Sequence, residues 1–299
     1  MNRYAPLLLA LAATWGASYL FIKVGVDGGL SPSALMAART LIAAITLTAY
    51  LAVTSGWRKM LADLRATWRA ALILGVVNAA VPFWLVAWGE THIDSGVAAI
   101  AQATVPLCSL LIGLRFLPHE RIGPARVSGV LLGLAGVAVL AGVHPHGGWP
   151  AVAGTLGIVL ASVSYATAGI YGQVRVRSTS GPVLATGSMI AGFLMLLPPA
   201  LVQFPEQMPT RGAVASVLAL GLLGTAAAQL VLFRILALYG ARKLSLVTFL
   251  MPGFALVYGA LVLDEHVEAI AIVGLALILL GVALGSGVLR SPLRFAPAK

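Results

Sequence analysis

The chain has 299 residues, of which 60% are hydrophobic and only 9% are charged, whereas a soluble globular domain carries about 25% charged residues. This composition excludes a soluble protein, because too few polar side chains remain to coat a core of this size. The net charge of +10 does not indicate nucleic-acid binding, since the basic residues are spread over short segments between apolar runs.

Ten apolar runs follow one another along the chain, each close to the roughly 20 residues that a helix needs to cross the bilayer core. The sequence therefore predicts an all-α membrane protein with ten transmembrane helices. The first run is too long for a secretory signal and is interpreted as the first membrane helix. The predicted helices cover residues 5–24, 33–54, 70–89, 96–116, 125–143, 152–173, 182–202, 213–236, 245–263 and 269–288.

Lysine and arginine favour cytoplasmic loops, so their distribution predicts the orientation of the helices. With the N-terminus inside, sixteen of the nineteen basic residues and two of the nine acidic residues fall on the inner side. Both termini are therefore predicted to be cytoplasmic. The inner basic residues are Arg3, Arg58, Lys59, Arg65, Arg69, Arg115, Arg121, Arg126, Arg175, Arg177, Arg234, Arg242, Lys243, Arg290, Arg294 and Lys299. The outer acidic residues are Asp27, Glu90, Asp94, Glu206, Asp264, Glu265 and Glu268.

The two halves of the chain match at an offset of 146 residues, which becomes 145 after one deletion. Each half has five predicted helices, an odd number, so the halves insert in opposite directions. We therefore predict two inverted five-helix repeats, residues 1–145 and 146–299, an arrangement typical of secondary transporters with a substrate site near the midplane. The matched pairs are Ser18-Tyr19 with Ser164-Tyr165, Gly75 with Gly221, Pro106 with Pro252 and, after the deletion, Glu120 with Glu265.

Several segments resemble the EamA domain of the drug/metabolite transporter superfamily. The first predicted helix resembles its opening motif in TWGASYLFIKVG, and the second resembles its second helix in SPSALMAARTLIAA. The ends of the two repeats are similar in RFLPHERIGPARVSGVLLGLAGVAVL and LVLDEHVEAIAIVGLALILLGVAL, although His119-Glu120 and Asp264-Glu265 replace the usual Gly-Glu. The resemblance covers nearly the whole chain and implies export of metabolites, amino acids or drugs from bacterial cells. Size and loop pattern are similar to the aromatic amino-acid exporter branch.

Two prolines at matched positions lie inside predicted helices. A proline lacks an N–H group, so Pro106 frees the carbonyl of Gln102 and Pro252 frees that of Thr248. In a membrane a freed carbonyl must face protein or a water-filled cavity. We interpret the two prolines as hinges beside a central cavity. The alternative is a static kink that a neighbouring helix repairs.

Polar and aromatic residues within the predicted helices are candidates for the wall of that cavity. Trp15, Ser18 and Tyr19 share one face of the first helix by their spacing, and an aromatic wall with hydroxyls and amides suits a flat, amphipathic solute. The alternatives are the interfacial aromatic belt for the rings and helix–helix hydrogen bonds for the amides. The predicted substrate-binding set is Trp15, Ser18, Tyr19, Asn78, Pro82, Gln102, Tyr165, Gln229 and Thr248.

The charged residues raise separate alternatives. Arg39 either binds a substrate carboxylate or snorkels to the outer interface, about 9 Å away at helical rise. No Asp or Glu lies in the middle of a predicted helix, which favours gradient-driven movement over a proton antiporter with a buried carboxylate relay. The acidic residues of GETHIDSG and DEHVE are interpreted as solvated outer turns, since their spacing matches no metal signature.

The sequence thus predicts a secondary transporter that exports small amphipathic metabolites across the bacterial inner membrane by alternating access, with neutral or aromatic amino acids as favoured substrates. An exporter of drugs or lipophilic cations is the alternative. A receptor or scaffold without transport is the alternative from another class. We expect no enzymatic activity, no cofactor and no metal. The expected partners are a small-molecule substrate and the lipid bilayer, without nucleic acid, and the oligomeric state stays open, a monomer included.

Overall fold

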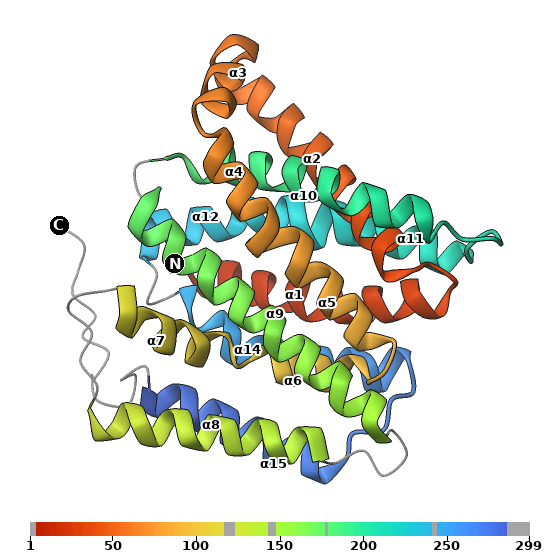
Figure 1. The fold of residues 1–299 in the computed structure, drawn as a ribbon, viewed down its shortest axis with the longest axis vertical. Coiled ribbons are helices and arrows are strands. Elements are labelled where there is room, and N and C mark those ends of the chain that lie inside the picture. The colour runs from red at the N-terminus through yellow and green to blue at the C-terminus, as the bar shows by residue number, and fades with distance from the viewer. Residues whose placement is uncertain (1–3, 117–122, 143–147, 177–178, 241–243, 286–299) are drawn as a thin grey trace.

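The computed structural model describes residues 4–116, 123–142, 148–176, 179–240 and 244–285 (Figure 1). These described residues form helices and contain no strand. Every predicted apolar run falls on a helix or on a chain of helical segments, with ends that agree to about one turn. Some of the predicted features lie outside the described residues. They are the helix ends at 143 and 286–288, the residue Glu120, and eight of the inner basic residues.

The elements of the first half are α1 (Tyr4–Asp27), α2 (Pro32–Ser55), α3 (Trp57–Ala66), α4 (Trp68–Leu74), the π-helix η1 (Gly75–Ala80), α5 (Val81–Glu90), α6 (Ser95–Gln102), α7 (Val105–Phe116) and α8 (Pro124–Gly142). Those of the second half are α9 (Gly148–Arg175), α10 (Gly181–Val202), α11 (Arg211–Ala219), the π-helix η2 (Leu220–Ala227), α12 (Ala228–Tyr239), α14 (Val247–Val262) and α15 (Ala269–Gly285).

Seven helical stretches among the described residues are long and apolar enough to cross a membrane. They are Tyr4–Asp27, Pro32–Ser55, Trp68–Glu90, Ser95–Phe116, Gly148–Arg175, Gly181–Val202 and Arg211–Tyr239. The helices at Val127–Leu140, Val247–Val262 and Ala269–Gly285 are apolar but shorter. Large hydrophobic side chains such as Ile45, Leu131 and Leu223 are exposed on the surface, as contact with lipid requires. The chain is therefore a multi-pass membrane protein.

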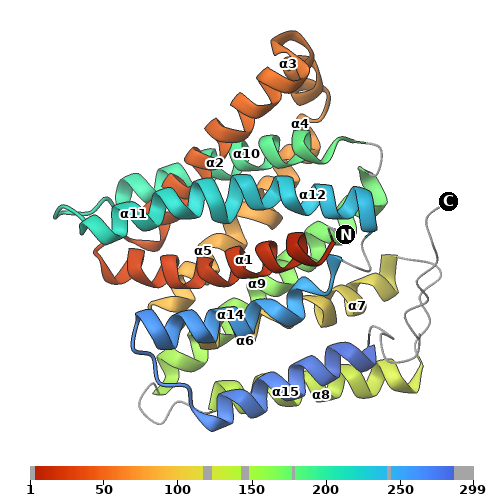
Figure 2. The same cartoon turned by 180° about the vertical axis from the view of Figure 1, so that it is seen from behind.

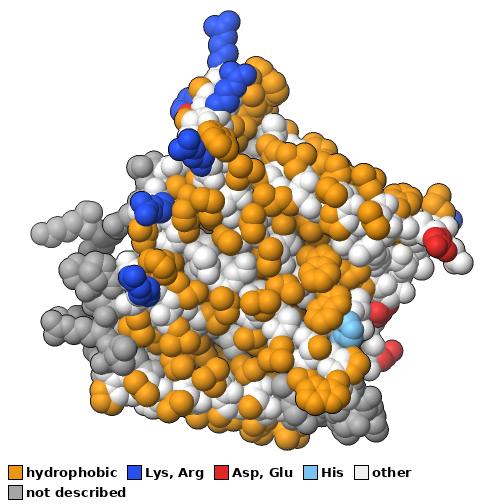
Figure 3. Space-filling view, in the orientation of Figure 1, with side chains coloured by type: hydrophobic (Ala, Val, Ile, Leu, Met, Phe, Trp, Pro, Cys, Tyr) orange, Lys and Arg blue, Asp and Glu red, His pale blue; other side chains and the backbone are white. Residues whose placement is uncertain are grey.

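Charged side chains gather at two opposite edges of the molecule. Figure 3 shows most Lys and Arg side chains along the upper and left edges and most Asp and Glu side chains along the right edge, with a broad hydrophobic surface between them. Three of the basic residues, Arg58, Lys59 and Arg65, lie on α3, a short helix between the second and third predicted membrane helices. Only Met60 of α3 is buried, so this helix lies on the surface.

The helices of the two halves pack in corresponding pairs. Helix α1 lies between α12 and α14 (Figure 2), and its sequence counterpart α9 lies between α5 and the α6–α7 pair. Helix α2 packs on η2, and its counterpart α10 packs on η1. Two further pairs, α2 with α10 and α8 with α15, each join an element to its own counterpart. Several contacts of one half are thus repeated by the matched elements of the other.

The two π-helices occupy matched positions. In η1 the widened turn brings the Val81 N–H to the Val76 carbonyl, and in η2 the Ala228 N–H reaches the Leu223 carbonyl. Pro82 is the second residue after η1, but its counterpart in the second half is Ala228. The widened turn therefore does not depend on proline. Such π-turns inside α-helices are frequent at functional sites.

The fourth predicted helix is broken, and this corrects the expected position of Pro106. Helix α6 ends at Gln102 and α7 begins at Val105, so Pro106 lies in the first turn of a new helix rather than inside a continuous one. A missing N–H costs little in a first turn, because that group has no partner within the helix. Pro252, in contrast, lies inside α14. The two matched prolines therefore have different local structures.

The contact between α8 and α15 depends on glycine. A methyl group at Gly281 would lie 2.5 Å from the Gly129 carbonyl oxygen and 2.7 Å from the Gly133 backbone nitrogen. The two backbones therefore touch, which is how small residues allow membrane helices to associate.

We expect Gly281→Ala to lower the stability of the protein by about 1–3 kcal/mol, because the added methyl must push the two backbones apart. Thermal unfolding in detergent measures this effect. Gly253→Ala is the matched control, since Gly253 is helical, exposed and has no atom within 4 Å of the added methyl. Equal melting temperatures for the two variants would contradict the assigned contact.

Candidate functional site

The guanidinium of Arg39 is buried between elements of both halves. Arg39 extends from α2 and is only 7% exposed, so the snorkelling interpretation is wrong. Its Nε donates a hydrogen bond to the Thr225 Oγ1 of η2 at 2.8 Å. Its guanidinium carbon lies 4.0 Å from the ring centroid of Phe83 on α5, within the range of a cation–π interaction. The charge is therefore held by elements of both halves.

Two tyrosines at matched positions of the repeat lie near this guanidinium. Tyr19 comes from α1 and is 5% exposed, and Tyr165 comes from α9. Both hydroxyls lie within electrostatic range of Arg39 and of each other. The Tyr165 ring packs on Phe83 with the centroids 6.4 Å apart. We call Tyr19, Arg39, Phe83, Tyr165 and Thr225 the arginine–tyrosine cluster.

The positive charge of Arg39 has no carboxylate partner among the residues that the structure describes. Its polar contacts there are the Thr225 hydroxyl and the Met36 sulfur, 3.8 Å from Nη1. Arginine cannot lose its proton in a protein, and a buried charge is stabilised chiefly by an opposite charge with matching hydrogen bonds. The cluster can therefore bind an anionic group, and a carboxylate fits the planar guanidinium best.

Serines at matched positions lie against the two π-helices beside the cluster. Ser164 Oγ on α9 donates to the Val77 carbonyl of η1 at 2.9 Å. Its counterpart Ser18 on α1 faces η2, since a methyl added at Gly224 would lie 2.8 Å from Ser18 Oγ. The Ser18 hydroxyl itself bonds to the Thr14 carbonyl of its own helix at 3.2 Å. Each π-helix is thus contacted by a hydroxyl from the helix at its side.

Gln102 is the last residue of α6, and only the nitrogen of its side-chain amide has a hydrogen-bond partner. Its Nε2 donates to Ser162 Oγ on α9 at 3.1 Å. Its Oε1 is buried and has no hydrogen-bond partner in the described structure. A buried acceptor without a partner is costly, and most such atoms bind water or a ligand. Gln102 therefore has a free acceptor at the break between α6 and α7.

The sequence comparisons agree with this architecture. The profile of the EamA-like transporter family matches residues 2–142 and again residues 152–287. The chain belongs to the EamA-like transporter family. Proteins of this family are transporters rather than enzymes.

Named relatives of this EamA-like transporter are transporters as well. A Streptantibioticus cattleyicolor protein named as a probable terminal-alkyne amino-acid exporter is 28% identical over 282 residues, which cover 93% of this chain and 91% of the relative. The Escherichia coli protein named as the uncharacterized inner membrane transporter YedA is 30% identical over 72% of this chain and 67% of its own. A solved crystal structure at 21% identity matches the fold with a TM-score of 0.67, over 97% of this chain and 99% of that one.

In this EamA-like transporter, the residues of the predicted site differ in their burial and in their neighbours. Tyr19 and Tyr165 belong to the cluster, Ser18 lies against Gly224 next to Thr225, and Gln102 is bonded to Ser162 of α9. The Thr248 hydroxyl bonds to the Ser245 carbonyl in its own turn at 2.7 Å. The others are Trp15, half-buried between two core groups; Asn78, half-buried in η1; Pro82, buried after η1; Gln229, half-buried in α12; Pro106, half-buried; and Pro252, buried.

Sequence reasoning misses two kinds of residue in this transporter. Phe83 and Thr225 are ordinary membrane-helix residues, and only the crossing of α2 with α5 and η2 brings them to Arg39. The interpretation of Glu90 as part of a solvated turn is wrong, because Glu90 is fully buried. Since Glu90 directly precedes a polar turn, its sequence carries no signal of burial.

Glu265 also has a structural role that its sequence position does not indicate. Its carboxylate accepts hydrogen bonds from Ser95 N at 2.8 Å, Ser95 Oγ at 2.8 Å and Gly96 N at 3.2 Å. These donors form the N-terminus of α6, where an anion is favoured by the unpaired N–H groups and the helix dipole. The segment before α15 is thereby fixed to α6.

We expect Thr225→Val to destabilise the transporter by about 1–3 kcal/mol, because it removes the hydrogen-bond acceptor of a buried guanidinium. Thermal unfolding in detergent measures the loss. Thr54→Val is the matched control, since Thr54 is exposed and bonds only to the Tyr50 carbonyl of its own helix. If both variants had the melting temperature of the parent protein, the hydrogen bond to Arg39 would make no contribution to stability.

Proposed function

We propose that this EamA-like transporter is a secondary transporter that exports small amphipathic metabolites with a free carboxylate, and that neutral or aromatic amino acids are its favoured substrates. This proposal rests on the buried Arg39 guanidinium. Aromatic rings lie around it, and no carboxylate among the described residues pairs with it. The Arg39 guanidinium binds the substrate carboxylate. Phe83, Tyr19 and Tyr165 offer flat apolar surfaces to the side chain.

The wider structure supports transport by alternating access. The family profile matches the chain twice, the matched helices pack in corresponding pairs, and both π-helices recur. We therefore propose two inverted repeats, residues 1–145 and 146–299, in which the three shorter apolar helices complete a set of ten. Separation of basic and acidic edges supports cytoplasmic termini in the bacterial inner membrane (Figure 3). Opposed bundles would rock around the arginine–tyrosine cluster at their common centre.

Two other functions compete with amino-acid export. A lipophilic-cation exporter is disfavoured by the fixed positive charge of Arg39, which would repel a cationic drug at the centre of the protein. A receptor or scaffold without transport would need no alternating access. The name of the Streptantibioticus cattleyicolor relative, which refers to an amino-acid exporter, supports the amino-acid proposal.

Solute flux in proteoliposomes tests the proposed function. Vesicles loaded with unlabelled phenylalanine should take up labelled phenylalanine by exchange when they contain the purified protein. Other neutral amino acids should compete, whereas phenylethylamine, which lacks the carboxylate, and tetraphenylphosphonium should not. Absence of exchange for every amino acid tried would overturn the proposal. Competition by tetraphenylphosphonium alone would favour the cation alternative.

We expect Gln102→Leu to raise the KM for phenylalanine exchange about 2- to 10-fold, the value of one lost hydrogen bond. Stability should change little, because the substitution also removes an unsatisfied buried acceptor and Ser162 keeps its bond to the Ile158 carbonyl. Gln173→Leu, at the exposed end of α9, is the control. A lower melting temperature with unchanged KM would assign Gln102 to helix packing instead.

We also propose that Pro106 and Pro252 act as hinges, Pro106 by keeping α6 and α7 separate and Pro252 by removing one hydrogen bond within α14. Alanine at either position should slow exchange several-fold while the protein stays folded, because a continuous helix resists bending. Initial rates of exchange measure this. Pro198→Ala in α10, where the proline is exposed, should leave the rate unchanged. Parental rates in both hinge variants would refute the hinge proposal.

A further inference from the structure

Glu90 is a carboxylate without a partner. It is the last residue of α5 and is 0% exposed. Neither Oε1 nor Oε2 has a hydrogen-bond partner in the described structure. Two of the other outer acids do have partners: Asp27 forms an ion pair with Lys23 at 3.4 Å, and Glu265 accepts three hydrogen bonds from α6.

The nearest cation does not neutralise this carboxylate. Lys23 Nζ donates to the backbone carbonyl of Glu90 at 3.0 Å, and its ion pair is with Asp27. Two further acids, Asp27 and Glu265, add negative charge within electrostatic range of Glu90, while Arg39 and Lys23 add positive charge. The titratable groups that face Glu90 are therefore Tyr19, Lys23 and Asp27 on α1, Arg39 on α2 and Glu265 before α15, with Tyr165 on α9 beside Arg39.

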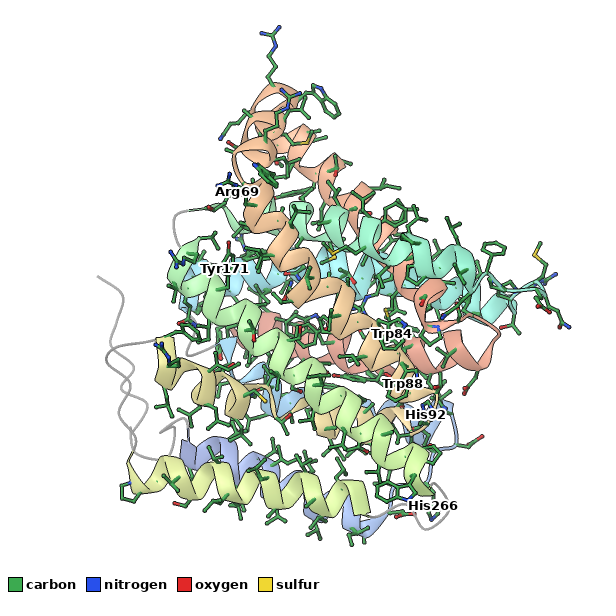
Figure 4. All side chains as sticks on the ribbon, in the orientation of Figure 1. Arg69, Trp84, Trp88, His92, Tyr171 and His266 are labelled. Atoms are coloured by element: carbon green, nitrogen blue, oxygen red, sulfur yellow. The ribbon has the colours of Figure 1, made fainter. Side chains whose placement is uncertain are left out.

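Close packing between α5 and α9 closes off the space around Glu90. A methyl group at the preceding Gly89 would lie 2.8 Å from Ile158 Cγ1 and 3.1 Å from the Gly154 carbonyl oxygen of α9. The Trp84, Trp88 and His92 side chains follow one another along α5 and the turn after it (Figure 4). The Trp84 and Trp88 rings are stacked with their centroids 6.1 Å apart, and the Trp88 and His92 rings are tilted with their centroids 4.7 Å apart. Helix α5 is thus packed tightly beside Glu90, whose side chain is closed to solvent in this structure.

A buried carboxylate without a hydrogen bond or ion pair favours its protonated form, because the ionised form has lost its water without gaining a direct partner. When a movement of α5 against α1 or α9 admits water, the ionised form becomes favourable. The packing in this structure and the protonation of Glu90 therefore depend on each other. A transporter that changes between closed and open packing would bind and release a proton here in every cycle.

We propose that Glu90 is a proton-binding site that couples proton movement to solute export. This inference rests on the proposed function. In each cycle a proton from water on one side forms an O–H bond with the carboxylate, and that bond breaks when Glu90 meets water on the other side. The proton moves down its gradient and one solute moves the opposite way. This replaces the expectation, based on sequence, of transport without a carboxylate relay.

The experiment measures two activities in the same proteoliposomes. Phenylalanine exchange without any gradient reports on the solute site, and phenylalanine accumulation under an imposed pH gradient, with the voltage clamped, reports on coupling. In the parent protein the gradient should raise accumulation several-fold. Glu90→Gln should keep exchange and lose the response to the gradient. Glu206→Gln, on the exposed outer loop, should keep both activities.

The outcomes separate this inference from the proposed function. No exchange in the parent protein would overturn the proposed function and the coupling with it. Exchange without any response of the parent protein to the pH gradient, or a full response in Glu90→Gln, would overturn the proton site alone. If Glu90→Gln does not fold, Glu90→Leu replaces it. If neither folds, the infrared C=O stretch of a protonated carboxyl in the parent protein at neutral pH decides, and its absence rejects the site.

Discussion

The burial of one positive charge organises the centre of this protein. A guanidinium inside a membrane protein needs hydrogen-bond acceptors and polarisable neighbours, and Arg39 obtains them from Thr225 of η2 and Phe83 of α5. These contacts hold α2 between elements of both halves. Because the charge has no carboxylate partner among the described residues, the same contacts that stabilise it leave it able to bind a carboxylate from outside.

Glycine allows the helices to approach closely enough for this centre to form. Lipid provides little hydrophobic force between helices, so their association depends on close packing and a few polar contacts. Gly75 and Gly221, at matched positions in the π-helices, bring η1 against Ala191 of α10 and η2 against Ile42 of α2. The π-helices are thus the points where each half receives a helix of the other.

The sequence predicts the features that depend on composition and length. Each apolar run forms a helix or a chain of helical segments, and the tyrosines selected by the internal repeat, Tyr19 and Tyr165, lie within electrostatic range of each other. Prediction fails where the outcome depends on a distant helix. Arg39 and Glu90 each lie near a helix end, which favours a solvated side chain, and only packing against distant helices buries them, α5 and η2 in the case of Arg39. The break before Pro106 is not predictable, because a proline fits both a kinked helix and the first turn of a new one.

Equilibrium binding with paired changes tests the central claim most directly. Affinities of the purified parent protein and of Arg39→Met are measured for phenylalanine and for phenylalaninol, which lacks the carboxylate. If the guanidinium binds that carboxylate, the losses of affinity caused by removing the guanidinium and by removing the carboxylate are not additive. Phenylalanine should bind the parent protein more tightly than phenylalaninol does, and Arg39→Met should abolish this difference. An undiminished preference for phenylalanine in Arg39→Met would show that the carboxylate is bound elsewhere and would contradict a substrate-binding role for Arg39.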